Sequence, residues 1–199
     1  LPEAITATAR IAEQCACPIG FEGWRFPAAH LPAGETPFSV LWQKSFEGLR
    51  QRYRPISSEA VERLRYELSI IEEKGFSPYF LVVDEIAAQA REWGLRTIGR
   101  GSAANSLVSH CLGLTHVDPL AHGLFFERFL NPERSSPPDI DLDFSWKDRD
   151  RLLAWVYERF GHERVAMIST HVTFGPRAAA REVGKAHGLP DAELTRLTK

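Results

Sequence analysis

Several features that would point to particular classes of protein are scarce in this sequence of 199 residues. Cysteine occurs only at Cys15, Cys17 and Cys111, which is too few and too irregular for a disulfide framework and favours a reducing compartment. No run approaches the roughly 18 apolar residues of a membrane span, and the first residues do not resemble a secretory signal. We therefore expect a cytoplasmic protein with no membrane partner.

An excess of basic charge is also lacking, because the formal net charge is −2. The whole chain therefore does not resemble a strongly basic nucleic-acid-binding domain, and any phosphate chemistry must be local. The only methionine is Met167 and the chain begins at Leu1, so we expect a piece of a longer protein. With 44% hydrophobic and 25% charged residues, the composition is that of an ordinary globular domain.

The first half of the chain has the pattern of helices. A short helix is predicted near Glu3–Gln14, and prolines and glycines from Pro18 to Pro37 then indicate an irregular connector. Apolar residues recur every three or four positions in the segments 38–53, 58–74 and 79–93, which predicts three packed helices.

Beyond Gly94, short apolar runs alternate with helical segments. Strands are predicted at LRTIG (95–99), DIDLDF (139–144) and RVAMIS (164–169), and helices near 103–111, 120–130, 148–160, 177–187 and 191–197. This order predicts an α+β fold in which helices back a small mixed sheet.

Three aspartates alternate with apolar residues in the segment from Pro138 to Phe144. On a strand, Asp139, Asp141 and Asp143 would share one face, where their mutual repulsion raises their pKa values unless a cation is present. Same-face neighbours lie about 6–7 Å apart, which suits a pair of Mg²⁺ ions with oxygen ligands. An edge strand with a solvated acidic face gives the same pattern, and an EF-hand fits poorly because Phe144 replaces the turn glycine.

A glycine-rich loop, Gly99 to Ser106, follows one predicted strand and leads into a predicted helix. Free backbone N–H groups there would face a phosphate, and Ser102 adds a hydroxyl donor. The loop has no Walker A lysine, and the acidic residue expected after a dinucleotide fingerprint is missing. A tight turn also requires glycine for geometry alone, so a structural role remains open.

Arg128 lies between aromatic residues in the segment FFERFLNPER. Its side chain could pair with Glu127 or Glu133, or could clamp a phosphate. Zinc is disfavoured because neither His110 with Cys111 nor Cys15 with Cys17 has partners at metal-ligand spacing. A serine triad has no support because the chain contains no nucleophile-elbow motif.

Taken together, six segments in this order resemble the palm of bacterial C-family DNA polymerases, the family of the DNA polymerase III alpha subunit. The segments are GFSPYFLVVDEI, GRGSAANS, VDPL, LFFERFLNPER, PDIDLDF and THVTFGPRAAAREVG. The resemblance spans roughly Glu59 to Gly188 and implies a palm like that of polymerase beta-like nucleotidyltransferases.

The resemblance implies a role for particular residues. Asp139 and Asp141 would hold two Mg²⁺ ions, and Asp143 and Arg100 would support them. Gly101, Ser102 and Arg128 would contact the triphosphate of a dNTP. The implied reaction is attack of a primer 3′-hydroxyl on the α-phosphate, with primer-template DNA as the partner.

The resemblance also implies a division of the chain. Residues 1–40 would connect to an upstream PHP-like domain, 41–170 would form the first part of the palm, and 171–199 would begin a helical thumb. The family's third catalytic aspartate would follow Lys199, so we expect this chain alone to be inactive. Asn105, where replicative members usually carry glycine, favours the error-prone, translesion branch. The alternatives are a replicative alpha subunit, a non-catalytic nucleotide- or nucleic-acid-binding module, and another nucleotidyltransferase.

Overall fold

Helices account for most of the regular structure in a computed structural model that describes residues 2–15, 26, 29, 31–134 and 136–198. Most of the predicted connector lies outside these residues. The first four helices are α1 (Pro2–Gln14), α2 (Pro37–Arg52), α3 (Ser58–Glu73) and α4 (Ser77–Glu92). The three helices predicted between residues 38 and 93 are therefore confirmed, with ends that differ by at most two residues.

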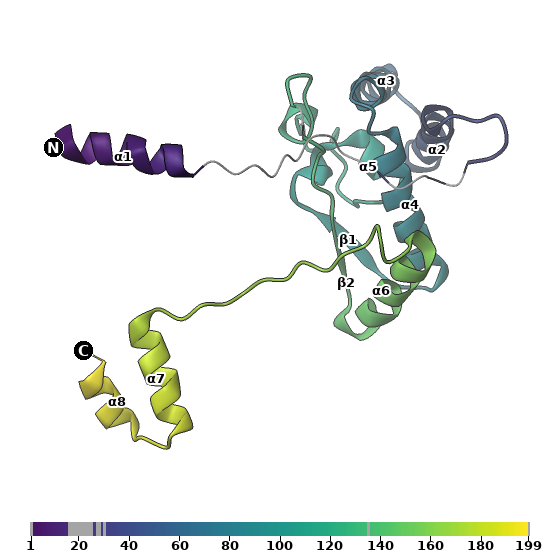
Figure 1. The fold of residues 1–199 in the computed structure, drawn as a ribbon. Helices are drawn as coiled ribbons and strands as arrows, with labels where there is room; N and C mark the ends of the chain where they lie inside the picture. The colour runs from purple at the N-terminus through teal and green to yellow at the C-terminus, as the bar shows by residue number, and fades with distance from the viewer. Residues whose placement is uncertain (1, 16–25, 27–28, 30, 135, 199) are drawn as a thin grey trace. The chain divides into compact units, whose positions relative to one another are not determined.

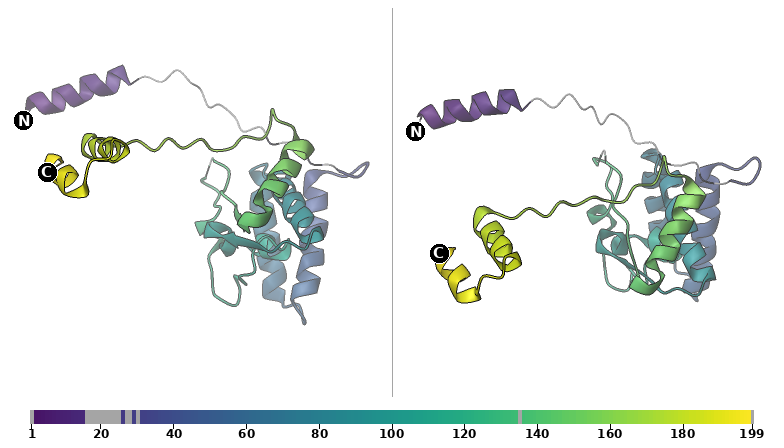
Figure 2. Two further views of the ribbon diagram at one scale, coloured as in Figure 1. Left: turned by 90° about the horizontal axis from the view of Figure 1, so that it is seen from below. Right: turned by 60° about the horizontal axis from the view of Figure 1, so that its bottom comes forward.

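Apolar side chains at helical spacing hold α2, α3 and α4 together. Leu64, Leu68 and Ile71 of α3 are completely buried in the same cluster as Leu41 of α2 and Phe80 of α4. Figures 1 and 2 show these helices grouped with α5. The packing provides a rigid base for the segments that follow.

Side chains before α2 and α3 cap their first turns. Thr36 and Ser39 form a reciprocal capping box at α2, and the Ser57 hydroxyl accepts a hydrogen bond from the backbone N–H of Ala60 at α3. These caps satisfy N–H groups that have no partner within the helix.

The sheet consists of two antiparallel strands, β1 (Thr97–Arg100) and β2 (Asp141–Phe144) (Figure 1). Thr97 pairs with Phe144, and Arg100 pairs with Asp141. The prediction of a mixed sheet is wrong for the described residues, because RVAMIS forms no strand there. A strand needs a hydrogen-bonding partner, and the apolar composition of that segment does not supply one.

One predicted helix is shorter than expected, and the prediction of another is wrong. The loop after β1 forms a 3₁₀ turn, η1 (Gly101–Asn105), and only Leu107–Cys111 forms a helix, α5, capped by the Ser106 hydroxyl. The segment 120–130 contains only the 3₁₀ turn η2 (Phe126–Arg128). Its start is occupied instead by a turn in which the Asp118 carboxylate accepts the N–H groups of Leu120 and Ala121.

The last helices are α6 (Trp146–Phe160), α7 (Pro176–Ala186) and α8 (Asp191–Leu197), all predicted from the sequence. The chain divides into two compact units, residues 1–164 and 165–199. In the first unit, Trp155 of α6 contacts Trp93 edge-to-face, and Arg159 pairs with Glu85 of α4. In the second, Gly184 of α7 lies against Leu194 of α8.

Candidate active site

The pairing of β1 with β2 brings the two sequence motifs together. The register sets Arg100 opposite Asp141, so the glycine-rich loop begins beside the first aspartate of the strand. Gly101 follows with φ of +71°, and a Cβ there would lie 3.2 Å from Asp141 Oδ2. A glycine is required because other residues strain in this conformation and would crowd the carboxylate.

The two faces of the strand pair differ in chemistry. Asp141 and Asp143 alternate with Leu142, which packs against the buried core. The predicted alternation is therefore confirmed for these two aspartates. Asp139 is exposed and precedes β2, so the strand register does not position it.

Arg100 bridges the acidic face of β2. Its Nε lies 2.9 Å from Asp143 Oδ2, and its Nη1 lies 3.8 Å from Asp141 Oδ2. The hydrogen bond to Asp143 is the main reason that the pKa of Arg100 is raised. These side chains are 40–62% exposed, and ion pairs so accessible to water contribute little stability. The guanidinium can therefore be displaced by another cation at small energetic cost.

Tyr79 of α4 is a further neighbour of the aspartates that pattern reasoning did not select. Burial raises the pKa of its hydroxyl, a hydrogen bond from the Ile140 backbone opposes this, and the charges of Asp139 and Asp141 raise the pKa further. Tyr79 also contacts the rings of Phe26 and Phe80, which fix its position. In the sequence, Tyr79 belongs to the aromatic segment GFSPYF. The apolar pattern of that segment predicts a core helix and does not mark Tyr79 as a site residue.

The N-terminus of α5 is not available to a ligand, because a buried carboxylate occupies it. Glu67 of α3 accepts hydrogen bonds from the backbone N–H groups of Leu107 and Val108, at 2.9 and 3.0 Å, and from the Ser106 hydroxyl at 2.8 Å. Arg63 donates to the same carboxylate at 2.7 Å. Any phosphate held by this loop would therefore meet η1, where Ser102 lies, and not a longer helix.

Arg128 is exposed on η2, which packs against η1. In the described part of the chain its side chain forms no ion pair with Glu127 or Glu133, the partners suggested by the sequence. Glu127 instead accepts a hydrogen bond from the Tyr66 hydroxyl at 2.8 Å. Arg128 thus remains free to meet an anion near Ser102.

The donor set at this site fits Mg²⁺ better than a transition metal. All the charged acceptors are carboxylate oxygens, and Mg²⁺ needs only one or two of these when water and phosphate complete its shell. Among the described residues, no cluster of three or more histidine, cysteine, aspartate or glutamate side chains has the arrangement of a metal site. The carboxylates would therefore hold an ion together with a substrate rather than enclose it.

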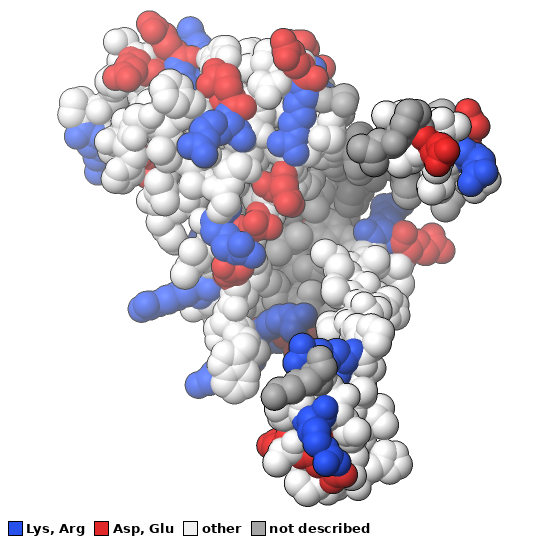
Figure 3. Space-filling view, turned by 90° about the vertical axis from the view of Figure 1, so that its left-hand side faces the viewer, with Lys and Arg blue, Asp and Glu red and all other residues white. Residues whose placement is uncertain are grey.

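Charge on the surface is mixed. Figure 3 shows acidic and basic side chains interspersed over one face, in agreement with the net charge of −2.

Among the described residues, no helix is both long and apolar enough to cross a membrane.

Comparisons with known proteins agree on one family. Residues 39–199 match the family described as bacterial DNA polymerase III alpha NTPase domain. The chain is 41% identical over 198 residues to the error-prone DNA polymerase of Symbiobacterium thermophilum, covering 100% of this chain and 18% of that protein. It is 39% identical over 197 residues to the error-prone DNA polymerase of Alkalilimnicola ehrlichii, covering 98% of this chain and 19% of that protein.

A relative with a different name has a similar level of identity. The chain is 43% identical over 199 residues to the DNA polymerase III subunit alpha of Bacillus subtilis, covering 100% of this chain and 18% of that protein. The chain therefore spans less than a fifth of the length of these three curated relatives. Sequence identity alone therefore does not distinguish an error-prone polymerase from a polymerase III alpha subunit.

Proposed function

The chain belongs to the bacterial DNA polymerase III alpha family, and from that premise we propose that it supplies the metal-binding and triphosphate-binding part of a larger DNA-directed DNA polymerase. The reaction is transfer of a nucleotide from a dNTP to the 3′-hydroxyl of a primer on a DNA template. The juxtaposition of Gly101 and Arg100 with Asp141 supports this proposal, because it joins a phosphate-type loop to a carboxylate pair.

In this proposal Asp139 and Asp141 hold two Mg²⁺ ions, which when bound would acidify the primer hydroxyl and neutralise charge on the triphosphate. Asp143 keeps Arg100 beside the carboxylates, through the hydrogen bond between them. Gly101 leaves the space next to Asp141 open, and Ser102 and Arg128 donate to phosphate oxygens. Their half-buried and exposed side chains make them accessible to a nucleotide.

We further propose that residues 41–170 form the first part of the palm, that residues 171–199 begin the thumb, and that residues 1–40 connect to an upstream domain. Because the chain spans less than a fifth of its curated relatives, polymerisation would depend on parts of the protein outside it. By itself the chain would be inactive. The compartment would be the bacterial cytoplasm.

The metal assignment is tested by Asp139→Asn and Asp141→Asn in the full-length protein. Each change removes a negative ligand but keeps the side-chain volume, so we expect nucleotide incorporation to fall at least about a hundredfold while DNA affinity stays within about twofold. Single-turnover incorporation and DNA-binding titrations measure the two effects separately.

The matched control is Asp150→Asn on α6, an exposed aspartate outside the acidic strand. It should incorporate nucleotides at the wild-type rate. Near-normal incorporation by the Asp139 or Asp141 variant would reject the two-metal assignment for these carboxylates.

Within the family, we propose that the protein belongs to the error-prone, translesion branch, on the basis of Asn105. The Asn105 side chain donates a hydrogen bond to the backbone carbonyl of Ser102 at 2.9 Å, so it closes the turn that carries the phosphate-binding residues. A replicative alpha subunit is the second candidate, because of the 43% identity to the Bacillus subtilis protein. The frequency of base substitution during gap filling by the full-length protein distinguishes the two.

A further inference from the structure

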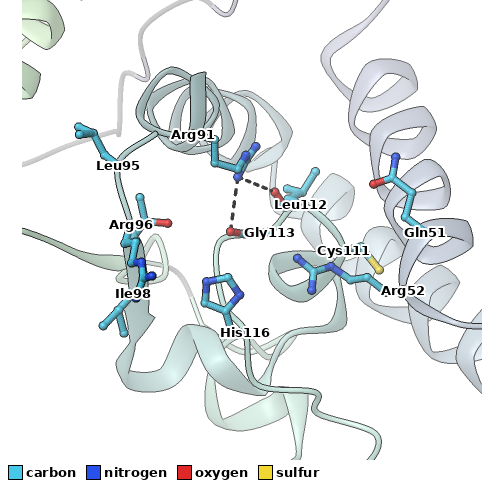
Figure 4. Close-up of a pocket in the computed structure, with 11 residues that line it drawn as sticks. Gln51, Arg52, Arg91, Leu95, Arg96, Ile98, Cys111, Leu112, Gly113 and His116 are labelled. Carbon is cyan, nitrogen blue, oxygen red and sulfur yellow. Dashed lines mark hydrogen bonds between the residues drawn. The ribbon is translucent and has the colours of Figure 1, made fainter. Parts of the chain in front are cut away.

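A second site, lined by cationic side chains, lies at the other end of β1. It is a pocket of about 750 Å³ between α2, α4 and the loop after α5 (Figure 4). Its lining includes Arg52, Arg91, Arg96 and His116, and no aspartate or glutamate among the described residues. Arg96 and Arg100 are four residues apart, about 13 Å along an extended strand. The pocket is therefore distinct from the acidic face of β2.

Two of the guanidinium groups converge over Gly113. A Cβ at that position would lie 3.1 Å from Arg91 Nη1 and 3.3 Å from Arg52 Nη2, so the two side chains occupy the space that any larger residue would need. Figure 4 shows them reaching this point from α4 and α2. Like charges that approach so closely repel each other unless an anion lies between them.

Nearby carboxylates do not balance this charge. Asp84 Oδ1 is 3.4 Å from Arg91, but Asp84 Oδ2 forms the closer ion pair, at 2.6 Å, with Lys44. One carboxylate is thus shared by two cations. The side chains of Arg52 and Arg96 form no ion pair or hydrogen bond with any other described residue.

Arg91 also has a structural role, which separates it from the other two arginines. It donates to the backbone carbonyls of Leu112 and Gly113, at 3.2 and 3.4 Å, and thereby holds the loop after α5. The guanidinium groups of Arg52 and Arg96 form no such hydrogen bonds to described backbone carbonyls. Their presence on the rim of one pocket requires another explanation.

We propose that this pocket binds phosphate groups, carried by a free polyphosphate or nucleotide or by a nucleic-acid backbone. Guanidinium groups match phosphate oxygens in shape and charge and can each donate two hydrogen bonds. Leu95, Ile98 and Leu112 add apolar side chains to the lining, and these would contact the sugar or base attached to the phosphate. The site is independent of the two-metal chemistry proposed above.

The test is hydrogen–deuterium exchange of the full-length protein, followed in peptides that contain Leu112–His116. The probes are inorganic pyrophosphate and a 20-nucleotide oligothymidylate, titrated separately. Local protection reports on this pocket, whereas binding at the acidic strand would protect peptides that contain residues 139–144. The two proposals can therefore fail separately.

The variant is Arg52→Glu with Arg96→Glu, and the control is Arg50→Glu with Arg65→Glu, which changes the net charge equally on exposed positions outside the lining. We expect the first pair to weaken protection at least about tenfold in apparent affinity, and the control to leave it within about twofold. Arg52→Gln with Arg96→Gln provides a milder second variant if the charge reversal impairs folding.

Protection by pyrophosphate assigns the site to free phosphates, and protection by the oligonucleotide alone assigns it to a nucleic-acid backbone. Either result supports the proposal when the pocket variant loses it. The proposal is overturned if neither probe protects Leu112–His116 in the wild type, or if the pocket and control variants respond equally.

Discussion

At the scale of single residues, Glu67 shows how a polar side chain organises the fold beneath the site. Burial raises the pKa of its carboxyl, while hydrogen bonds from Leu107, Val108 and Arg63 oppose that change. A carboxylate that receives four donors, in a place where water is excluded, ties α3 to α5. Sequence patterns do not predict this role, because a single glutamate at an apolar position of a helix only weakens the apolar periodicity.

Asp118 carries a pH dependence whose sign follows from its contacts. Burial raises its pKa, but the Tyr53 hydroxyl and the N–H groups of Ala121 and Leu120 lower it more, so the pKa lies below the ordinary 3.8. Stability from these contacts is present above pH 3.8 and is lost as the pH falls through the folded-state pKa.

We therefore expect Asp118→Asn to cost about 1 kcal/mol at pH 7, since it weakens hydrogen bonds to a charged acceptor. The difference from wild type should stay constant above about pH 5 and shrink below pH 3.8. Urea unfolding at a series of pH values measures it. A difference that is the same at pH 7 and pH 2.5 would show that the charge of Asp118 has no role.

At the scale of elements, β1 is held by one very close approach. A Cβ on Gly99 would lie 1.9 Å from the Leu114 carbonyl oxygen, so the strand and the loop after α5 touch backbone to backbone. This contact fixes the position of β1 relative to the core. It thereby aligns Arg100 and Gly101 with Asp141.

Gly99→Ala should therefore destabilise the protein by about 1–3 kcal/mol or more, because the added methyl group forces β1 away from Leu114. Gly175→Ala is the control, because φ there is −63° and a Cβ would meet nothing within 4 Å. Thermal unfolding of both variants gives the comparison. Equal melting temperatures would mean that β1 can shift without cost.

Two elements differ from the prediction for a common reason. The segments 103–111 and 120–130 have helical periodicity, but Ser106 and Asp118 use their side chains to bond nearby backbone N–H groups and start or interrupt the helices. Such residues compete with helical hydrogen bonding. Periodicity records which residues are buried, and not where the backbone changes direction.

At the scale of the whole chain, the two units differ in how much core they possess. The first contains the buried cluster around Leu64 and Phe80. The second, residues 165–199, buries little beyond Leu194, and units of this size rarely hold a stable core without further support. Residues 165–175 between the first core and α7 have no regular secondary structure.

Limited chymotrypsin digestion of the 199-residue chain should cut at Phe174, which is 60% exposed, before Phe80 or Phe129, which are completely buried. Mass spectrometry identifies the fragments. Phe174→Ala should suppress this early cut and leave the others unchanged. Earlier cleavage at Phe80 or Phe129 would contradict the assigned core.

The sequence by itself determined most of the helices, the strand with alternating aspartates and the family resemblance, because burial periodicity and short motifs are local properties of the chain. Only the tertiary structure decided which residues lie next to these motifs in space. The antiparallel register joined Arg100 and Gly101 to Asp141, Tyr79 approached the aspartates from α4, and Glu67 filled the N-terminus of α5. It also gathered Arg52, Arg91 and Arg96 around one pocket from three separate segments. These contacts join residues far apart in the chain, and no local pattern encodes which distant side chains will meet.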